Sequence, residues 1–240
     1  MKINVLLRMF LVMILLSTAA SLQAAAITTL STTDDAEIDQ HANWASDTRG
    51  IPHLNWGHNA TELRVKVYGD DYYTTGLRQD VMLKWDVSGI SSEPISNVSL
   101  NMAGWDGSDG PINVYGIIAA PNSWAETNVT WNSWANTTYS LVLLGQMYSS
   151  GPWAQVGDSA FSSSALTSFV ASWVDGTVAN NGLILKLDVA NPSAGTLGDS
   201  FSAKEELGYG HAPQLMITQV PEPTTITLLA CGLLGLIKRK

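Results

Sequence analysis

The sequence has 240 residues, a formal net charge of −9, 45% hydrophobic residues and a single cysteine. Between residues 27 and 219 there are 7 basic residues against 20 acidic ones, a net of −13, and so acidic a surface excludes nucleic acid as a partner. Cys231 lies outside this stretch, which therefore has no disulfide. Its length suffices for one domain with a well-buried core.

The N-terminus has the pattern of an export signal. Lys2 and Arg8 give a positive start, residues 11–16 are apolar, and Ala24 and Ala26 are small residues at alternate positions. This order predicts a secretory signal peptide over residues 1–26, cleaved after Ala24 or Ala26.

Short apolar runs with a period of two follow along the chain. Leu63, Val65 and Val67 alternate with polar residues, as expected for a half-buried strand, and turn residues bound the runs. Strands are predicted at 63–67, 81–85, 98–102, 112–118, 139–144, 183–189, 201–204 and 215–217. Residues 191–200 read as a loop.

One segment breaks this pattern. Leu166, Phe169, Val170 and Trp173 recur at helical spacing, with Ser164 as the predicted N-cap and Gly176 as the stop. Many short strands with one short helix favour an all-β, antiparallel two-sheet β-sandwich of jelly-roll type. We expect this domain at residues 27–218, flanked by the signal peptide and a C-terminal apolar helix.

The last segment, residues 219–240, combines a short linker, an apolar run and a basic end. Residues 224–237 would cover roughly 21 Å as a helix, short of a hydrocarbon core about 30 Å thick. The segment predicts a marginal membrane span with its basic end in the cytoplasm.

This tail resembles the PEP-CTERM sorting signal of Gram-negative bacteria. The resemblance implies recognition by an exosortase, transient membrane anchoring, removal of the tail, and release to the cell surface or extracellular matrix. The matching residues are Pro221, Glu222, Pro223, Lys238, Arg239 and Lys240.

The exported part resembles the DNRLRE-type domains, which are grouped with β-sandwich carbohydrate-binding modules. The matching stretches are DDAEI from Asp34, LRQDVMLKWDVSGI, SWAETNVTWNS with Trp124 and Glu126, GLILKL, FSAKE and PQLMI. The chain departs from the pattern in an expanded loop, QHANWASDTRGIPHLNWG, and in Lys204-Glu205, where the family has an Arg-Glu pair. The resemblance implies a β-sandwich that binds polysaccharide, alginate-like and anionic in particular, and a structural role for Glu126.

Basic and aromatic residues are the candidate ligand contacts. Arg64, Lys66 and Lys84 alternate with apolar neighbours, so they point away from the core and could bind uronate carboxylates; the alternative is an ordinary solvated face. Loop tryptophans could stack on sugar rings, or be partly buried. The candidate ligand-binding residues are Arg64, Lys66, Arg78, Lys84, Trp105 and Trp44.

Acidic residues cluster near the start of the domain. Asp34, Asp35 and Glu37 offer oxygen ligands of the kind that Ca²⁺ prefers, although the spacing is not that of an EF-hand. The alternatives are a structural calcium site and a solvated acidic edge.

Catalytic motifs are absent from the sequence: it has no nucleophile elbow and no HExxH. The sequence thus favours a secreted, non-enzymatic protein that binds polysaccharide or helps to build an extracellular matrix. The alternatives are a structural or adhesive surface protein without glycan binding and a polysaccharide-degrading enzyme with an unrecognised site.

Overall fold

The computed structural model describes residues 25–39, 62–67, 78–106, 110–119, 123–126, 129, 131–135, 138–148, 157–188, 197–205 and 210–220. The chain divides into two units. The larger one takes Thr28–Ser92 and Asn97–Ile217, and the smaller one takes Met1–Ile27, Glu93–Ser96 and Thr218–Lys240.

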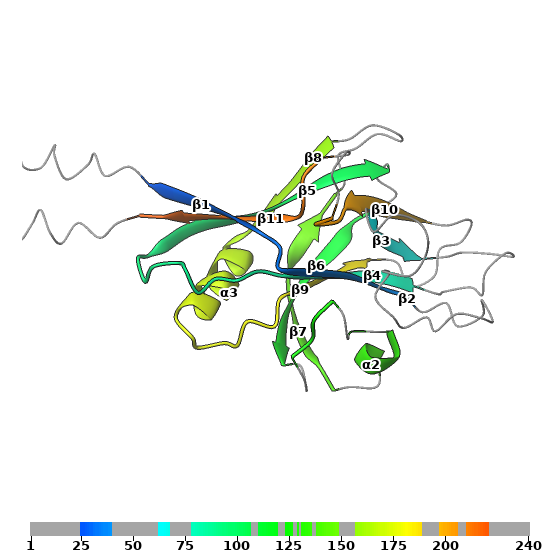
Figure 1. Ribbon diagram of the computed structural model, residues 1–240, viewed down its shortest axis with the longest axis horizontal. Coiled ribbons are helices and arrows are strands. Elements are labelled where there is room, and N and C mark those ends of the chain that lie inside the picture. The colour runs from blue at the N-terminus through cyan, green and yellow to red at the C-terminus, as the bar shows by residue number, and fades with distance from the viewer. Residues whose placement is uncertain are drawn as a thin grey trace, which may run out of the picture. The chain divides into compact units, whose positions relative to one another are not determined.

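Eleven strands form an antiparallel β-sheet in the described part of the chain (Figure 1). The predicted all-β class is therefore confirmed. The strands are β1 Ala26–Ser31, β2 Asp34–Asp39, β3 Glu62–Val67, β4 Arg78–Lys84, β5 Ile95–Asp106, β6 Ile112–Ala119, β7 Ser140–Met147, β8 Gly157–Ser162, β9 Leu183–Leu187, β10 Leu197–Ser202 and β11 Gln214–Gln219.

The sheet order is β1-β11-β5-β10-β3-β4-β9-β6-β7, with β2 paired to β4 and β8 paired to β5. Among the described residues the join between β3 and β4 is narrow, because only Lys66↔Gln79 and Val67↔Arg78 are paired there. We call β2, β4, β9, β6 and β7 the β4 half of the sheet. The other six strands are the β5 half.

Both faces of β4 are buried. Val81 and Leu83 point to one face and Met82 to the other, and all three are fully buried. A strand covered on both sides is apolar at consecutive positions, which explains the run VML in place of strict alternation. Trp85, directly after β4, is also buried.

All eight predicted strands are present, but the prediction missed β1, β2 and β8 and placed residues 191–200 in a loop. For residues 197–200 that prediction is wrong, because they belong to β10. The segment LGDS carries turn residues, yet β10 pairs with β3 along its whole length, from Leu197↔Val67 to Ser202↔Glu62. Tertiary pairing overrides the local preference here.

Helix α3, Ser164–Val174, lies where helical spacing predicted it. The predicted cap is wrong by one residue: Ser163 is the N-cap, in extended conformation, and its hydroxyl accepts a hydrogen bond from the Leu166 amide at 2.9 Å. The apolar stripe is buried as expected. Its Phe169 packs on β6 at Gly116, where a Cβ would lie 2.3 Å from the ring.

A second helix, α2, Trp131–Ala135, was not predicted. It is five residues long, and its Trp134 is buried and stacked on Tyr139 with ring centroids 4.3 Å apart. Trp134 is therefore a core residue rather than a loop aromatic available to a sugar.

The smaller unit is described at residues 25–27, 93–96 and 218–220. Here the Val220 amide donates to the Pro94 carbonyl at 3.0 Å, and the Gln219 side chain donates to the Glu93 carbonyl at 2.9 Å. Gln219 was expected in a linker, but it is the last residue of β11. The last strand of the sheet therefore ends at Gln219.

Candidate functional site

A row of polar side chains crosses one face of the β4 half. Lys186 on β9 lies opposite Asn113 on β6, and Asn113 lies opposite Gln146 on β7. Directly opposed residues share a face, and Lys186 extends the row to β4 through its ion pair with Asp80. We call these four residues the polar row. Four adjacent strands make it roughly 14 Å long.

The polar row is held by hydrogen bonds between its own members. The Gln146 amide group donates to Asn113 Oδ1 at 2.9 Å and to Asp188 Oδ2 at 2.8 Å. The Asn113 amide group donates in turn to the Tyr115 hydroxyl at 3.3 Å. Amides and a phenol fixed in this way present oriented donors and acceptors on the same face.

Asp80 is a buried carboxylate between two cations. Lys186 Nζ lies 3.0 Å from Asp80 Oδ2 and Arg78 Nε lies 3.6 Å from Oδ1, while the Asp80 side chain has no exposed surface. Burial raises the pKa of Asp80, and the charges of Lys186 and Arg78 oppose the rise. The two cations keep 19% and 22% of their side-chain surface exposed, so the positive side of this ion triad meets solvent.

Beyond the polar row, the same face is apolar and covered. Met82 and Ile184 continue the β4 and β9 rows and are fully buried in a cluster with Trp124 and Trp134. Trp124 is fixed by a hydrogen bond from its ring nitrogen to the Asn181 carbonyl at 2.7 Å. The segment containing Trp124 and α2 therefore covers this part of the face. At the polar end Asp80 and Asn113 are also buried, Gln146 is exposed, and Lys186 and Arg78 are partly exposed.

The predicted ligand-binding residues fall in different places. Arg78 joins the ion triad, whereas Lys84, on the same face six residues along β4, lies with its ammonium 5.8 Å from the centre of the Trp124 ring. Arg64 and Lys66 are half-buried on β3, in the other half of the sheet. The structure does not bring these four cations together. Trp44 lies outside the described residues, as does the side chain of Trp105.

Sequence reasoning selected none of Asn113, Gln146 and Lys186 as a ligand contact. Each is an ordinary polar residue in its own strand. Only the register between β9, β6 and β7 places them side by side, and no local signal carries that register.

The predicted calcium ligands do not converge on one point. Asp34, Asp35 and Glu37 lie on β2, where neighbouring side chains point to opposite faces. Asp34 accepts a hydrogen bond from the Glu126 amide at 3.2 Å, and Glu37 accepts one from the Arg64 amide at 2.9 Å. Of the three, only Asp35 belongs to a carboxylate cluster.

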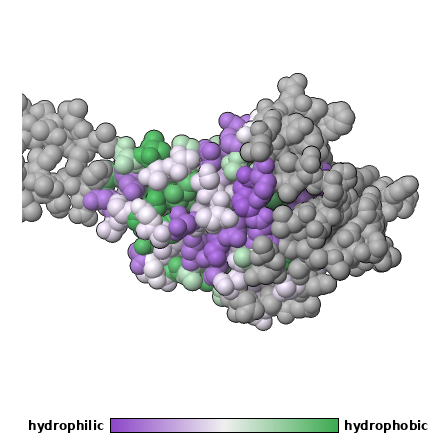
Figure 2. Space-filling model, viewed as in Figure 1, coloured by the Kyte–Doolittle hydropathy of each residue, from purple (hydrophilic) through white to green (hydrophobic). Residues whose placement is uncertain are grey.

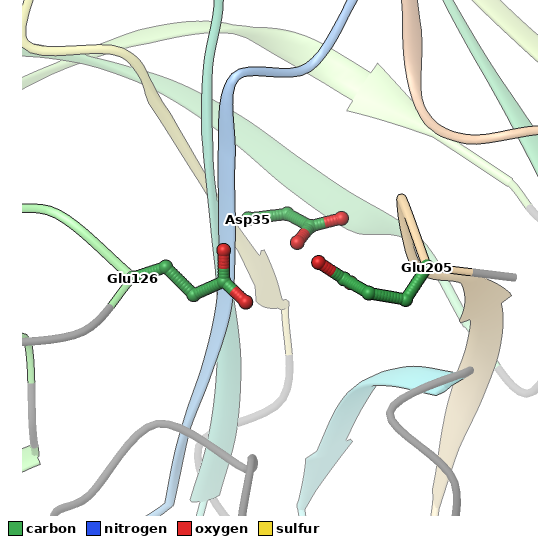
Figure 3. Close-up of side chains that lie close together, drawn as sticks. All are labelled: Asp35, Glu126 and Glu205. Atoms are coloured by element: carbon green, nitrogen blue, oxygen red, sulfur yellow. The ribbon is translucent and has the colours of Figure 1, made fainter.

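That cluster, the acidic triad, consists of Asp35, Glu126 and Glu205. Their carboxylates point toward one another from β2, from the segment 123–126 and from the turn after β10 (Figure 3). One oxygen of each lies within 4.8 Å of the others. The Lys204 ammonium contacts all three: it hydrogen-bonds to Glu126 and Glu205 and lies 3.5 Å from Asp35 Oδ1.

Burial and hydrogen bonds shift the pKa values of two groups at the acidic triad. Burial raises the pKa of Asp35 to about 6, against the lowering effects of the Lys204 amide and ammonium. Burial would lower the pKa of Lys204, but its hydrogen bonds to Glu126 and Glu205 raise it overall. At neutral pH Lys204 is therefore an ammonium, and the Asp35 carboxyl has a pKa of about 6.

The described surface is mixed in character. Figure 2 shows hydrophilic residues gathered across the middle of the described surface in this view, with hydrophobic residues toward β1. Among the described residues, no helix has the length and apolar character needed to span a membrane. The predicted signal peptide, the C-terminal apolar segment and the residues of the sorting signal lie outside the described part of the chain.

Comparison with known proteins adds no family to this description. No family model matches the chain, and no curated protein matches it significantly.

Proposed function

We propose that this chain is an exported, non-enzymatic β-sandwich protein that binds polysaccharide at the polar row. The observation that carries the proposal is the row itself: Lys186, Asn113 and Gln146 stand side by side across three strands, with Arg78 beside them. Such a set combines amide groups, which pair with sugar hydroxyls, and cations, which pair with carboxylates.

The chemistry of the polar row favours an acidic glycan. Arg78 and Lys186 are partly exposed cations on a chain that is otherwise strongly acidic, so they give a uronate carboxylate a local place to bind. Tyr115, half-buried beside Asn113, adds an aromatic surface of the kind that packs against a sugar ring. The ligand class we propose is therefore a uronate-containing, alginate-like polysaccharide.

The two halves of the sheet are proposed to face each other as the two layers of a jelly-roll-like sandwich. The narrow β3–β4 join supports this arrangement, as do contacts between the halves away from it. A Cβ on Gly145 of β7 would lie 2.9 Å from the ring of Phe161 on β8, and the Arg64 amide on β3 donates to Glu37 on β2. Such an arrangement leaves the polar row on the outer face of one layer.

Export and sorting complete the proposal. A signal peptide over residues 1–26 would direct the chain out of the cytoplasm, and an exosortase would act on the tail from Pro221 while it is held transiently in the membrane. The hydrogen bond from Val220 to Pro94 supports a folded domain that reaches to the residue before the sorting signal. The mature protein would then lie at the cell surface or in the extracellular matrix of a Gram-negative bacterium.

Retention of the purified protein on immobilised alginate, other uronates and neutral glycans tests the proposed function. We expect retention on uronates that weakens with salt, because the contacts are ionic. Gln146→Ala leaves the ion triad intact and should weaken retention several-fold, whereas Lys186→Arg, which keeps the charge, should retain most of it.

Three results would contradict this function. Lack of retention on every glycan would favour a structural or adhesive protein. If Gln146→Ala and Arg78→Met leave retention unchanged, the ligand binds away from the polar row. Release of shortened products from a glycan panel would make the protein an enzyme.

A further inference from the structure

The acidic triad needs a cation. Asp35, Glu126 and Glu205 come from three segments, and their oxygens lie within 4.8 Å of one another (Figure 3). Like charges at this distance disfavour ionisation unless a positive charge lies among them. The identity of that cation decides whether the triad is a metal site.

Lys204 supplies the cation from within the chain. Its ammonium hydrogen-bonds to Glu126 and Glu205 and lies 3.5 Å from Asp35. Its backbone amide donates to the other Asp35 oxygen at 2.6 Å, which fixes the start of the Lys204 side chain against the triad. An ammonium has three donors, and the three carboxylates lie around it.

A metal ion at the same place would have to displace this ammonium. Calcium takes six to eight oxygen ligands at about 2.3–2.6 Å, so it would have to occupy the space between the carboxylates. The Lys204 side chain is only 23% exposed, and its anchored amide restricts how far the ammonium can withdraw.

We infer that Lys204 is the resident cation of the acidic triad, and that its ammonium excludes divalent and trivalent cations from the three carboxylates. The Lys204 ammonium then links β2, the segment 123–126 and the turn after β10, because it contacts one carboxylate from each. It needs no metal from the medium for this link. This inference does not depend on glycan binding.

Terbium, a luminescent substitute for calcium, tests the inference in the purified protein. Trp124 lies two residues from Glu126, so excitation of tryptophan should sensitise Tb³⁺ held by the triad. In the wild type and in Lys204→Arg, which retains a cation, we expect no Tb³⁺ emission from the triad. Emission from the triad would be recognised because calcium displaces it and because it depends on Glu126. Lys204→Met keeps the apolar stem but removes the charge, and we expect at least about tenfold tighter Tb³⁺ binding than in the wild type.

Thermal unfolding gives a second, independent readout. The wild-type Tm should be the same in calcium and in chelator, whereas calcium should raise the Tm of Lys204→Met. A calcium-dependent Tm in the wild type that Glu126→Gln abolishes would overturn the inference, and this measurement does not require any lysine variant to fold. A folded Lys204→Met protein that gains no Tb³⁺ binding would also overturn it.

Discussion

Replacing Asp35 by asparagine separates the cost of burying its charge from the benefit of its hydrogen bonds. The asparagine oxygen can still accept the Lys204 amide, which lies 2.6 Å from Asp35 Oδ2. What the substitution removes is the ionisable group, 3% exposed, that faces Lys204, Glu126 and Glu205. The two proteins should therefore differ mainly in how their stability responds to pH.

The magnitude follows from the pKa of Asp35. In the unfolded chain this carboxyl has its ordinary value of 3.8, and in the folded protein burial raises its pKa to about 6. Between those values the folded state holds one proton more than the unfolded state, so the free energy of unfolding falls as pH rises. The complete difference is about 3 kcal/mol, present below pH ~4 and lost above pH ~6.

Urea unfolding of the wild type and Asp35→Asn at pH 4, 5, 6 and 7, followed by tryptophan fluorescence, measures this contribution. The stability of the wild type relative to the variant should fall by roughly 2.4 kcal/mol between pH 4 and pH 7, because pH 4 already lies just above the ordinary pKa of 3.8. The buried Asp80 is present in both proteins, so its contribution to the pH dependence of stability cancels in the difference between them.

Asp86→Asn is a matched control with the opposite sign. The Ser88 amide donates to the exposed Asp86 carboxylate and lowers its pKa, so this contribution is lost as pH falls. A difference between wild type and Asp35→Asn that stays flat or grows with pH would show that Lys204 outweighs burial, and would refute the reasoning.

Three further substitutions test the packing that positions the sites. Ser163→Ala removes the hydroxyl that caps the Leu166 amide and should cost about 1–2 kcal/mol in urea unfolding, with Ser163→Thr as the conservative control. Gly182→Ala should destabilise by more than 1 kcal/mol, because φ is +82° and the new Cβ would lie 2.2 Å from the Leu83 carbonyl oxygen; an unchanged Tm would contradict this close approach. Ile184→Ala, at a fully buried position, should cost about 2–5 kcal/mol, and a cost below 1 kcal/mol would mean that the site is poorly packed.

Local pattern in the sequence determined the elements of the fold. The alternation of Leu63 and Val65 with Arg64 and Lys66 identified β3, and the spacing from Leu166 to Trp173 identified α3. The prediction failed where local preference and tertiary pairing disagree. β10 contains turn residues, and α2 is too short to show a period.

The candidate sites were only partly predictable. The acids of β2 were selected from their clustering, but successive residues of a strand point to opposite faces, which separates Asp34 from Asp35. Glu37 shares the face of Asp35 but accepts the Arg64 amide, whereas Asp35 meets Glu126 and Glu205. Arg78 was selected as a basic strand residue, but the sequence did not predict that it lies beside the buried Asp80. A single sequence holds no signal for contacts between segments so far apart.

The sequence by itself determined the all-β class, the positions of eight of the eleven described strands and of helix α3, and the acidic composition, since these depend on local periodicity and composition. The tertiary structure decided which strands pair and in which register. That register sets Lys186 beside Asn113 and Gln146, and it brings the Lys204 ammonium among three carboxylates. The physical reason is that a shift of one residue in any pairing would turn these side chains to the other face.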